Sequence, residues 1–240
     1  MNYRNHLLSV LPPDALARLE PHFRRVSIEQ GAMLVREGEP FKSGMFLESG
    51  VISYVTRMAD GALVESLSIG REGAIGLSAS TSTGIALRTA LVQISGEGLA
   101  IGHDALRSAF RENESIRQMM LGYTAAVLSQ ALQRVVCNAR HSVEERLAWW
   151  LLINRDRIDG PFIEVKHDTL AAMLGVQRST ITLAARAIQA AGLIRYSRGV
   201  IELLDPAGLS GIACECYDKM QAQFDHLIPR YEPSAKRVRR

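Results

Sequence analysis

The chain has 240 residues, of which 47% are hydrophobic and 22% are charged, and its formal net charge at pH 7 is +3. This length and composition predict a globular protein of two domains, each able to bury its own core. No run of about 18 apolar residues is present, and Pro12 and Pro13 interrupt a polar N-terminal segment, so we expect neither a membrane span nor a signal peptide and place the protein in the cytoplasm.

The chain contains three cysteines, Cys137, Cys214 and Cys216. Three are too few for a disulfide framework and agree with a reducing compartment. Cys214 and Cys216 are two residues apart, so on a helix they would point in different directions, which argues against a metal-binding pair. We therefore expect buried thiols, no metal ligands and no cofactor.

Short apolar runs punctuated by glycine fill the segment 25–101, after a short helix expected over 13–22. The expected strands lie at 26–28, 33–35, 44–50, 51–57, 62–69 and 90–94. Asp60-Gly61 between two of them is a hairpin signal. Strands at this regular spacing predict an antiparallel barrel or roll.

A segment without proline follows and predicts a long helix over 111–138. Two apolar stripes run along it at heptad-like spacing. The first is Leu121, Ala125, Leu128, Leu132, Val135 and Ala139; the second is Ile116, Met120, Tyr123, Val127 and Ala131. Two stripes favour packing on the chain's own roll along one and on a second copy along the other, with Met120, Tyr123, Val127 and Ala131 at the dimer interface. A central helix within a monomer is the alternative.

Ser142 and Glu145 have the spacing of a capping box and open another helix, expected over 143–156. Beyond the turn Asp159-Gly160-Pro161, a strand is expected at 162–165. Asp168 is the expected cap of a helix that ends at Leu174, and Gly175 supplies a turn before a second helix over 178–191. Helix, glycine turn and helix predict a helix-turn-helix, whose second helix reads DNA bases in the major groove.

The first turn of this second helix is polar, as base reading requires. Arg178 is expected to contact a base or a phosphate, and Ser179, Thr180 and Thr182 to add hydroxyl contacts. Ser179 has an alternative role as a helix cap. The apolar residues of the helix are expected on its packing side: Ile181, Leu183, Ala184, Ala187 and Ile188.

Two strands joined at Ser197-Arg198-Gly199 follow and form a wing. The segment 163–199 carries five basic and two acidic side chains, a local charge of +3. Lys166, His167 and Arg198 are the expected phosphate contacts, which position a protein on DNA without reading its sequence. The alternative is a helix-turn-helix used only for packing against protein.

The chain resembles the Crp/Fnr superfamily of bacterial transcription regulators over nearly its whole length. The strongest match is LAAMLGVQRSTI from Leu170, with AAGLI behind it; EPFKSGMFLESG from Glu39 also resembles the family's roll turn. The resemblance implies an α+β protein: an N-terminal antiparallel β-roll of the cyclic-nucleotide-binding type over 1–108, a dimerisation helix over 109–141 and a winged helix-turn-helix over 142–228. A basic tail, 229–240, is expected to be disordered.

The resemblance also identifies an effector site in the roll, at Gly76, Arg88 and Thr89. In relatives that respond to cyclic AMP, the turn continues with a glutamate, where this chain has Leu77. The helix positions that would meet an adenine are Ala131 and Leu132. An unpaired ligand hydroxyl costs about 1–3 kcal/mol, so cyclic AMP is not expected. Arg88 is a candidate to pair with another anionic effector; the alternative is that it bonds carbonyl groups within the roll or faces solvent.

The N-terminus has no cysteine for the iron–sulfur centre of the oxygen-sensing branch, and isolated histidines do not indicate haem. No P-loop, GxSxG, HExxH or paired CxxC is present, so we expect no enzyme. The resemblance implies a homodimer on a palindromic operator, with RNA polymerase as a further partner and no membrane. The rival function is a small-molecule sensor whose output is a protein contact.

Overall fold

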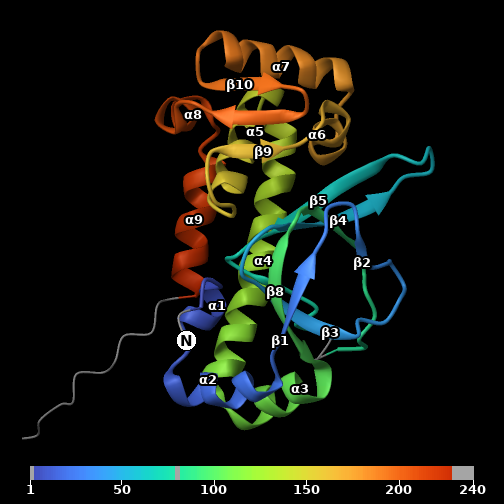
Figure 1. Ribbon diagram of the computed structural model, residues 1–240, viewed down its shortest axis with the longest axis vertical. Helices are drawn as coiled ribbons and strands as arrows, with labels where there is room; N and C mark the ends of the chain where they lie inside the picture. The colour runs from blue at the N-terminus through green and yellow to red at the C-terminus, as the bar shows by residue number, and fades with distance from the viewer. Residues whose placement is uncertain (1–2, 79–81, 229–240) are drawn as a thin grey trace, which may run out of the picture.

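The computed structural model describes residues 3–78 and 82–228 (Figure 1). The expected basic tail, 229–240, lies outside the described residues. Two short helices, α1 (His6–Ser9) and α2 (Pro13–Leu19), and the 3-10 turn η1 (Glu20–His22) precede the strands. The α2 and η1 segments together confirm the helix expected over 13–22, whereas α1 was not expected.

The strands form two antiparallel four-stranded sheets, as the roll prediction required. One sheet has the order β1-β8-β3-β6 and the other β2-β7-β4-β5. Their bounds are β1 Arg24–Ile28, β2 Met33–Val35, β3 Ser43–Leu47, β4 Val51–Arg57, β5 Leu63–Ile69, β6 Ala74–Ile75, β7 Thr89–Ile94 and β8 Gly96–Gly102. The hairpin signal is confirmed, because β4 and β5 pair and Gly61 between them has φ 87°.

The sequence prediction missed β8, which pairs with both β1 and β3. Its three glycines suggest a loop, but two of them, Gly96 and Gly98, allow close packing. A Cβ on Gly98 would lie 2.8 Å from Cγ of Met45, and one on Gly96 would lie 2.3 Å from the carbonyl oxygen of Ser49. The strand therefore needs glycine where neighbouring chain segments approach it.

Two helices, α3 (His103–Glu112) and α4 (Glu114–Arg140), occupy the region where one helix was expected to begin at Arg111. Asn113 separates them, because it adopts an extended conformation and its side-chain oxygen accepts a hydrogen bond from the Ile116 N–H at 3.0 Å. The 27-residue α4 is the longest helix in the described part of the chain and connects the roll to the C-terminal domain (Figure 1).

The two stripes of α4 do not face as expected. Met120 and Tyr123 are buried against the chain's own roll, where the Tyr123 hydroxyl donates to the carbonyl oxygen of Ala74 at 2.8 Å. Val127 and Ala131 are half-buried. The stripe through Leu128 and Leu132 is instead exposed, at 60% and 61%. Thus the stripe expected to meet a second copy is the one that packs within the chain.

The C-terminal domain begins with α5 (Val143–Arg155), whose capping box between Ser142 and Glu145 is present as predicted. Next come β9 (Phe162–Glu164), α6 (His167–Leu174), α7 (Arg178–Ala190), β10 (Ile194–Ser197) and β11 (Val200–Leu203). The three strands form an antiparallel sheet of order β10-β11-β9. Trp149 and Trp150 are buried at the centre of this domain's core.

Two further helices, α8 (Pro206–Ile212) and α9 (Cys216–Leu227), were not expected. Figure 1 shows α9 running back beside α4 toward the N-terminal helices. Phe224 near its end joins the core that the N-terminal helices share with α4. The C-terminal segment therefore packs against both domains. Among the described residues, no helix combines the length and the apolar character needed to cross a bilayer.

Candidate nucleic-acid interface

The helix-turn-helix consists of α6, a tight turn and α7. Gly175 ends α6 in the left-handed conformation, with φ 65° and ψ 39°, which glycine adopts without strain. Four residues of α7 are buried in the domain core: Ile181, Ala184, Ala185 and Ile188. Figure 1 shows α7 at the end of the molecule opposite α2 and α3, so its outer face is free of the rest of the chain.

The outer face of α7 begins with Arg178 and Ser179, both exposed as predicted, while Thr180 is half-buried. The N-cap is Gln177 and makes no side-chain cap. Ser179 is the second residue of the helix, so the alternative that it caps the helix is wrong. Its hydroxyl remains free to face DNA.

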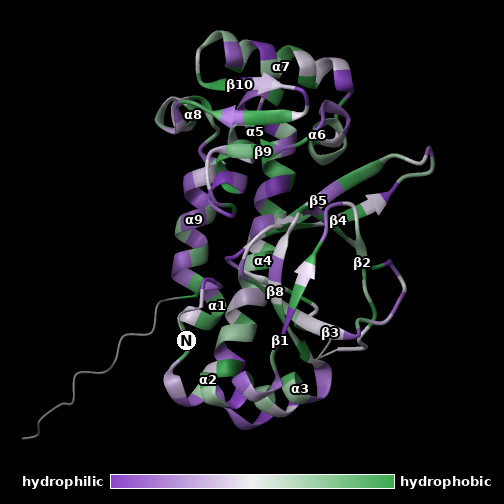
Figure 2. Cartoon of the chain, in the orientation of Figure 1, coloured by the Kyte–Doolittle hydropathy of each residue, from purple (hydrophilic) through white to green (hydrophobic). Residues whose placement is uncertain are grey.

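Leu183 and Ala187 were expected on the packing side, but both are exposed, Leu183 at 66%. Leu183 lies one turn after Ser179 on the same face, and the exposed Arg186 follows it. Figure 2 shows this mixture of hydrophilic and hydrophobic positions along α7. An apolar side chain in such a row fits contact with a thymine methyl group. The family's frequent arginine at the Leu183 position was the signal that this position faces outward.

Arg178 pairs with Asp168 at the start of α6, with Nε 3.3 Å from the carboxylate. Both side chains are more than two-thirds exposed, so the pair contributes little to stability. Asp168 was expected to cap α6, but the N-cap is Lys166, without a side-chain cap. The carboxylate of Asp168 instead holds the guanidinium of Arg178 beside the turn.

His167 lies in a pocket of the winged domain. Its ring stacks on Tyr196 with centroids 4.3 Å apart, and its Nδ1 lies 3.1 Å from the Thr182 hydroxyl. Its Nε2 is buried without a hydrogen-bond partner among the described residues. Burial, and then the charge of Arg178, lower the pKa of His167.

This packing does not fit the expected phosphate contact of His167, because neither ring nitrogen is presented to solvent. Thr182 is also held inside the motif: its hydroxyl donates to the Arg178 carbonyl oxygen at 3.0 Å. Both residues therefore position α7 against α6 and the wing.

The wing turn is formed by Arg198 and Gly199, with φ 49° and φ 84°. Two successive residues with positive φ are typical of the tight turns that fit a twisted hairpin. Lys166 is exposed and lies beside this turn: a Cβ added to Gly199 would be 3.8 Å from Cγ of Lys166. The structure thus brings Lys166 and Arg198, two expected phosphate contacts, together beside the wing.

The expected effector residues lie in the roll: Gly76 follows β6, Arg88 precedes β7 and Thr89 is the first residue of β7. Gly76 has φ 72°, and a Cβ there would lie 2.8 Å from the Ser43 carbonyl oxygen. Arg88 is half exposed; its guanidinium donates to the Leu87 carbonyl oxygen at 2.5 Å and lies 3.9 Å from Glu37. The Thr89 hydroxyl accepts the Glu37 N–H at 3.2 Å.

Apolar side chains fill the interior of the roll. A cluster of buried residues that includes Ile52, Leu67 and Val92 occupies it. Leu77 is 4% exposed and packs with Leu106 in the neighbouring core. Leu132 points to solvent. Neither Leu77 nor Leu132 offers a polar atom to a nucleotide, as the sequence indicated.

The three cysteines are buried and free of disulfides, as expected, but they lie together with His141. Cys214 precedes α9 and Cys216 is its first residue, so the two do not share a helix. The argument that a helix would point them apart therefore fails. The three sulfur atoms and one ring nitrogen of His141 all lie within 4.8 Å of one another.

Comparison with known proteins identifies one segment of the C-terminal domain. Residues 145–212 match the Crp-like helix-turn-helix domain. No curated protein matches the chain.

Three solved structures share the fold. FixK2 from Bradyrhizobium japonicum has a TM-score of 0.68 at 17% identity, over 80% of this chain and 98% of its own. A CRP-family transcriptional regulator from Thermus thermophilus, TTHB099, has a TM-score of 0.65 at 18% identity, over 78% and 96%. The c-di-GMP responsive global regulator CLP from Xanthomonas campestris has a TM-score of 0.63 at 17% identity, over 80% and 99%.

The chain thus combines a β-roll, a long helix and a winged helix-turn-helix, and the last of these matches a known type of DNA-binding domain. The sequence match to the Crp-like domain covers residues 145–212, and the fold of the whole chain is similar to that of solved Crp/Fnr-family regulators.

Proposed function

We propose that the protein is a sequence-specific regulator that binds a palindromic operator in the cytoplasm as a homodimer. The observation that carries this proposal is the outer face of α7, which presents Arg178, Ser179, Leu183 and Arg186 beside the basic wing turn. The side chains of this outer face contact the DNA bases. Lys166 and Arg198 contact phosphates, and RNA polymerase is a further partner.

Dimerisation uses the exposed stripe of α4. Leu121, Leu128, Leu132 and Val135 are each more than half exposed. With the exposed Ala125 between Leu121 and Leu128, they recur at the four-and-three spacing of a helix-pairing seam. A second copy packed along this seam places two α7 helices about one helical turn of DNA apart, roughly 34 Å.

The proposed domains are a roll over 1–108 that receives an effector, the helix region 109–141 and a DNA-binding domain over 142–228. An anionic effector other than cyclic AMP fits the roll at Gly76, Arg88 and Thr89. Arg88 supports this role because it is half exposed and its nearest carboxylate, on Glu37, is 3.9 Å away. CLP, which shares the fold, is described as responsive to c-di-GMP.

The test is selection of DNA from random fragments by the full-length protein without added ligand, followed by footprinting at two salt concentrations. An inverted repeat with half-sites about one helical turn apart supports the proposal, as does an affinity that falls steeply with salt. Recovery of an operator only after an anionic metabolite is added assigns control to the roll. Salt-insensitive binding of a protein, with no selected DNA under either condition, contradicts DNA recognition.

A further inference from the structure

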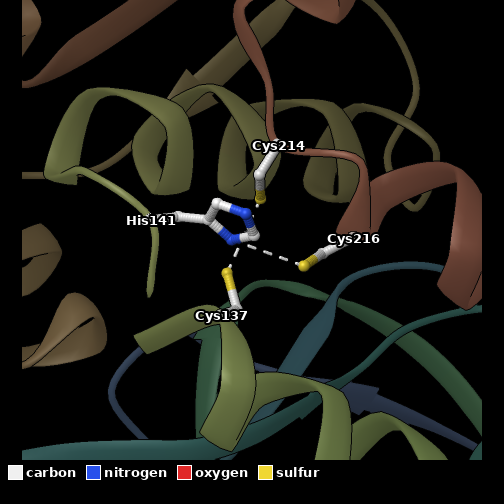
Figure 3. Close-up of side chains that lie close together, drawn as sticks. All are labelled: Cys137, His141, Cys214 and Cys216. Atoms are coloured by element: carbon white, nitrogen blue, oxygen red, sulfur yellow. Dashed lines mark hydrogen bonds between the residues drawn. The ribbon is translucent and has the colours of Figure 1, made fainter. Parts of the chain in front are cut away.

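The cluster of Cys137, His141, Cys214 and Cys216 contains all three cysteines of the chain. Cys137 and His141 are one helical turn apart where α4 ends. Cys214 and Cys216 flank Glu215 at the start of α9. Figure 3 shows the imidazole ring and the three sulfur atoms converging from these two segments. More than 70 residues separate them in sequence, so the fold brings together four side chains that each bind soft metal ions.

Two of the six distances between the ligand atoms are close to those of a tetrahedron around one ion, and all six are within 4.8 Å. With Zn–S bonds of about 2.3 Å and a Zn–N bond of about 2.0–2.1 Å, a tetrahedron has S···S edges of about 3.8 Å and S···N edges of about 3.5 Å. The Sγ atoms of Cys137 and Cys214 are 3.6 Å apart. Sγ of Cys216 is also 3.6 Å from Nδ1 of His141.

Other uses of the cluster fit less well. A disulfide needs an S–S distance of about 2.05 Å. An iron–sulfur cube places four irons between its ligands, each iron taking one, so its ligand atoms stand farther apart than around a single ion. A single tetrahedral ion therefore agrees best with the observed spacing.

The groups around the cluster orient its ligands. Nε2 of His141 lies 3.1 Å from a carboxylate oxygen of Glu215, which directs Nδ1 toward the three sulfurs. The side-chain amide of Gln133 donates to Sγ of Cys216 at 3.0 Å. A carboxylate behind the histidine and an N–H donor to a thiolate are common outer partners of protein-bound zinc.

The local charge also suits a metal–thiolate centre. One Zn²⁺ with three thiolates and a neutral imidazole carries a net charge of −1, after three thiol protons are released to solvent. Arg146 is 7% exposed; burial lowers the pKa of its guanidinium, and the nearby Cys137 and Cys214 oppose this shift. Its Nε has no hydrogen-bond partner among the described residues. The guanidinium thus lies where it offsets the charge of the centre.

We propose that Cys137, His141, Cys214 and Cys216 bind one Zn²⁺ ion as a structural Cys₃His site. The ion links the end of α4, from which the chain continues into α5, to the start of α9. It thereby fixes the winged domain on the long helix. The metal site stands on its own geometry, whereas its effect on operator binding rests on the proposed function.

The first measurement is the metal content of the untagged full-length protein by elemental mass spectrometry, followed by titration of the metal-free protein with Co²⁺. We expect about one zinc per chain, because the cluster supplies four ligands. Bound Co²⁺ should give the visible bands of a tetrahedral ion and thiolate-to-cobalt charge transfer. Three outcomes would overturn the proposal: no bound metal and no such spectrum, acid-labile sulfide with iron, or a Cys137–Cys214 disulfide in the protein isolated under reducing conditions.

Variants of the ligand residues distinguish a loss of zinc binding from a failure to fold. Cys214→Ser and His141→Ala should lose the zinc, whereas His141→Cys should retain it as a four-cysteine site. His226→Ala is the matched control, because His226 is an exposed histidine of α9 away from the cluster. Glu215→Gln should weaken zinc affinity by about 10–100-fold. Zinc retained by folded His141→Ala, as judged by circular dichroism, contradicts the assignment of the histidine.

Operator binding by the zinc-free variants distinguishes the two proposals. If Cys214→Ser loses zinc and binds the operator more weakly than His226→Ala does, the ion fixes the winged domain. If wild-type protein holds zinc but selects no DNA, the metal site stands and the regulator function fails.

Discussion

Arg178 is an exposed cation at the start of α7, and Asp168 holds it beside the turn between α6 and α7. If it reads a guanine with two hydrogen bonds, Arg178→Ala should cost about 1–3 kcal/mol of discrimination between the operator and a site with that base changed. Lys166→Ala, which removes a proposed phosphate contact, should instead weaken binding to all sequences alike and reduce the salt slope by about 1.

Competition binding with matched and mutated operators measures both effects. Arg25→Ala is the charge control, because Arg25 is exposed on β1, far from the winged domain. An Arg178→Ala protein that keeps the full preference of the wild type shows that another residue reads the base.

His167 makes the stability of the winged domain depend on pH. Its pKa lies below the ordinary 6.5, because burial and the charges of Arg178 and Arg186 disfavour the imidazolium and outweigh the opposing charge of Asp168. The stability from the neutral ring is therefore present above pH 6.5 and is lost as pH falls through the lowered pKa.

Thermal unfolding of the wild type and of His167→Gln between about pH 7.5 and pH 5.5 tests this dependence. The wild type should lose more stability on acidification than the variant, because glutamine cannot be protonated in this range. Equal losses would mean that the ring accepts a proton without cost.

At the scale of elements, the exposed stripe of α4 is the proposed dimer seam. Figure 2 shows hydrophobic positions among hydrophilic ones along this helix. Leu128→Glu combined with Leu132→Glu places two charges in the seam of each chain, and we expect monomers by analytical ultracentrifugation. Leu87→Glu, at a residue that is 77% exposed on the roll, is the control. A double variant that remains dimeric, with unchanged operator affinity, would remove this seam from the proposal.

Elements defined by local signals were predictable from the sequence. Ser142 with Glu145, Gly175 and Asp60-Gly61 each determine a cap or a turn through contacts within a few residues. The polar first turn of α7 predicted that Arg178 and Ser179 are exposed for the same reason. Leu183 was misplaced because a single apolar residue does not show whether its face packs or binds.

Features that depend on long-range packing were not predictable. The glycines of β8 are explained by neighbours such as Met45, and the inward stripe of α4 by the hydrogen bond between Tyr123 and Ala74. The metal-ligand cluster requires α9 to return beside α4, which brings Cys214 close to Cys137. No local pattern contains this information.

At the scale of the whole molecule, a buried junction joins the two domains. Glu65 of β5 lies 3.6 Å from Nη2 of Arg134 in α4, and both side chains are buried. The Arg134 guanidinium also covers the ring of Trp149 in α5 at 4.5 Å, and it donates to the Met173 carbonyl oxygen of α6 at 3.4 Å. One arginine of the long helix therefore contacts the roll, α5 and α6 of the helix-turn-helix.

Within the roll, Glu65 accepts a hydrogen bond from the Ser53 hydroxyl at 2.6 Å, and Ser53 also lies against Gln93. Burial raises the pKa of Glu65 above its ordinary 4.5, and the charge of Arg134 opposes this shift. Ionised Glu65 thus depends on Arg134. This electrostatic contact joins the roll to the long helix, and the same arginine reaches the C-terminal domain through Trp149 and Met173.

We expect Arg134→Met to destabilise the protein by about 3–5 kcal/mol at neutral pH, because it leaves the carboxylate of Glu65 buried without its partner. Without the guanidinium the pKa of Glu65 rises further, and a raised pKa contributes stability that is lost as pH rises through it. The stability of Arg134→Met should therefore fall more steeply with rising pH than that of the wild type. Adding Glu65→Gln should remove this dependence and recover part of the loss, because a neutral amide needs no counter-charge.

Calorimetry of the wild type, Arg134→Met, Glu65→Gln and the double variant measures the loss of stability and its dependence on pH. If the junction couples the domains, Arg134→Met should also unfold in two separated transitions where the wild type unfolds in one. The double variant distinguishes charge from packing. Recovery on adding Glu65→Gln assigns the loss to the buried carboxylate, whereas an equally unstable double variant assigns it to lost contact with Trp149. A single, unshifted transition in Arg134→Met would show that the domains are held together without this arginine.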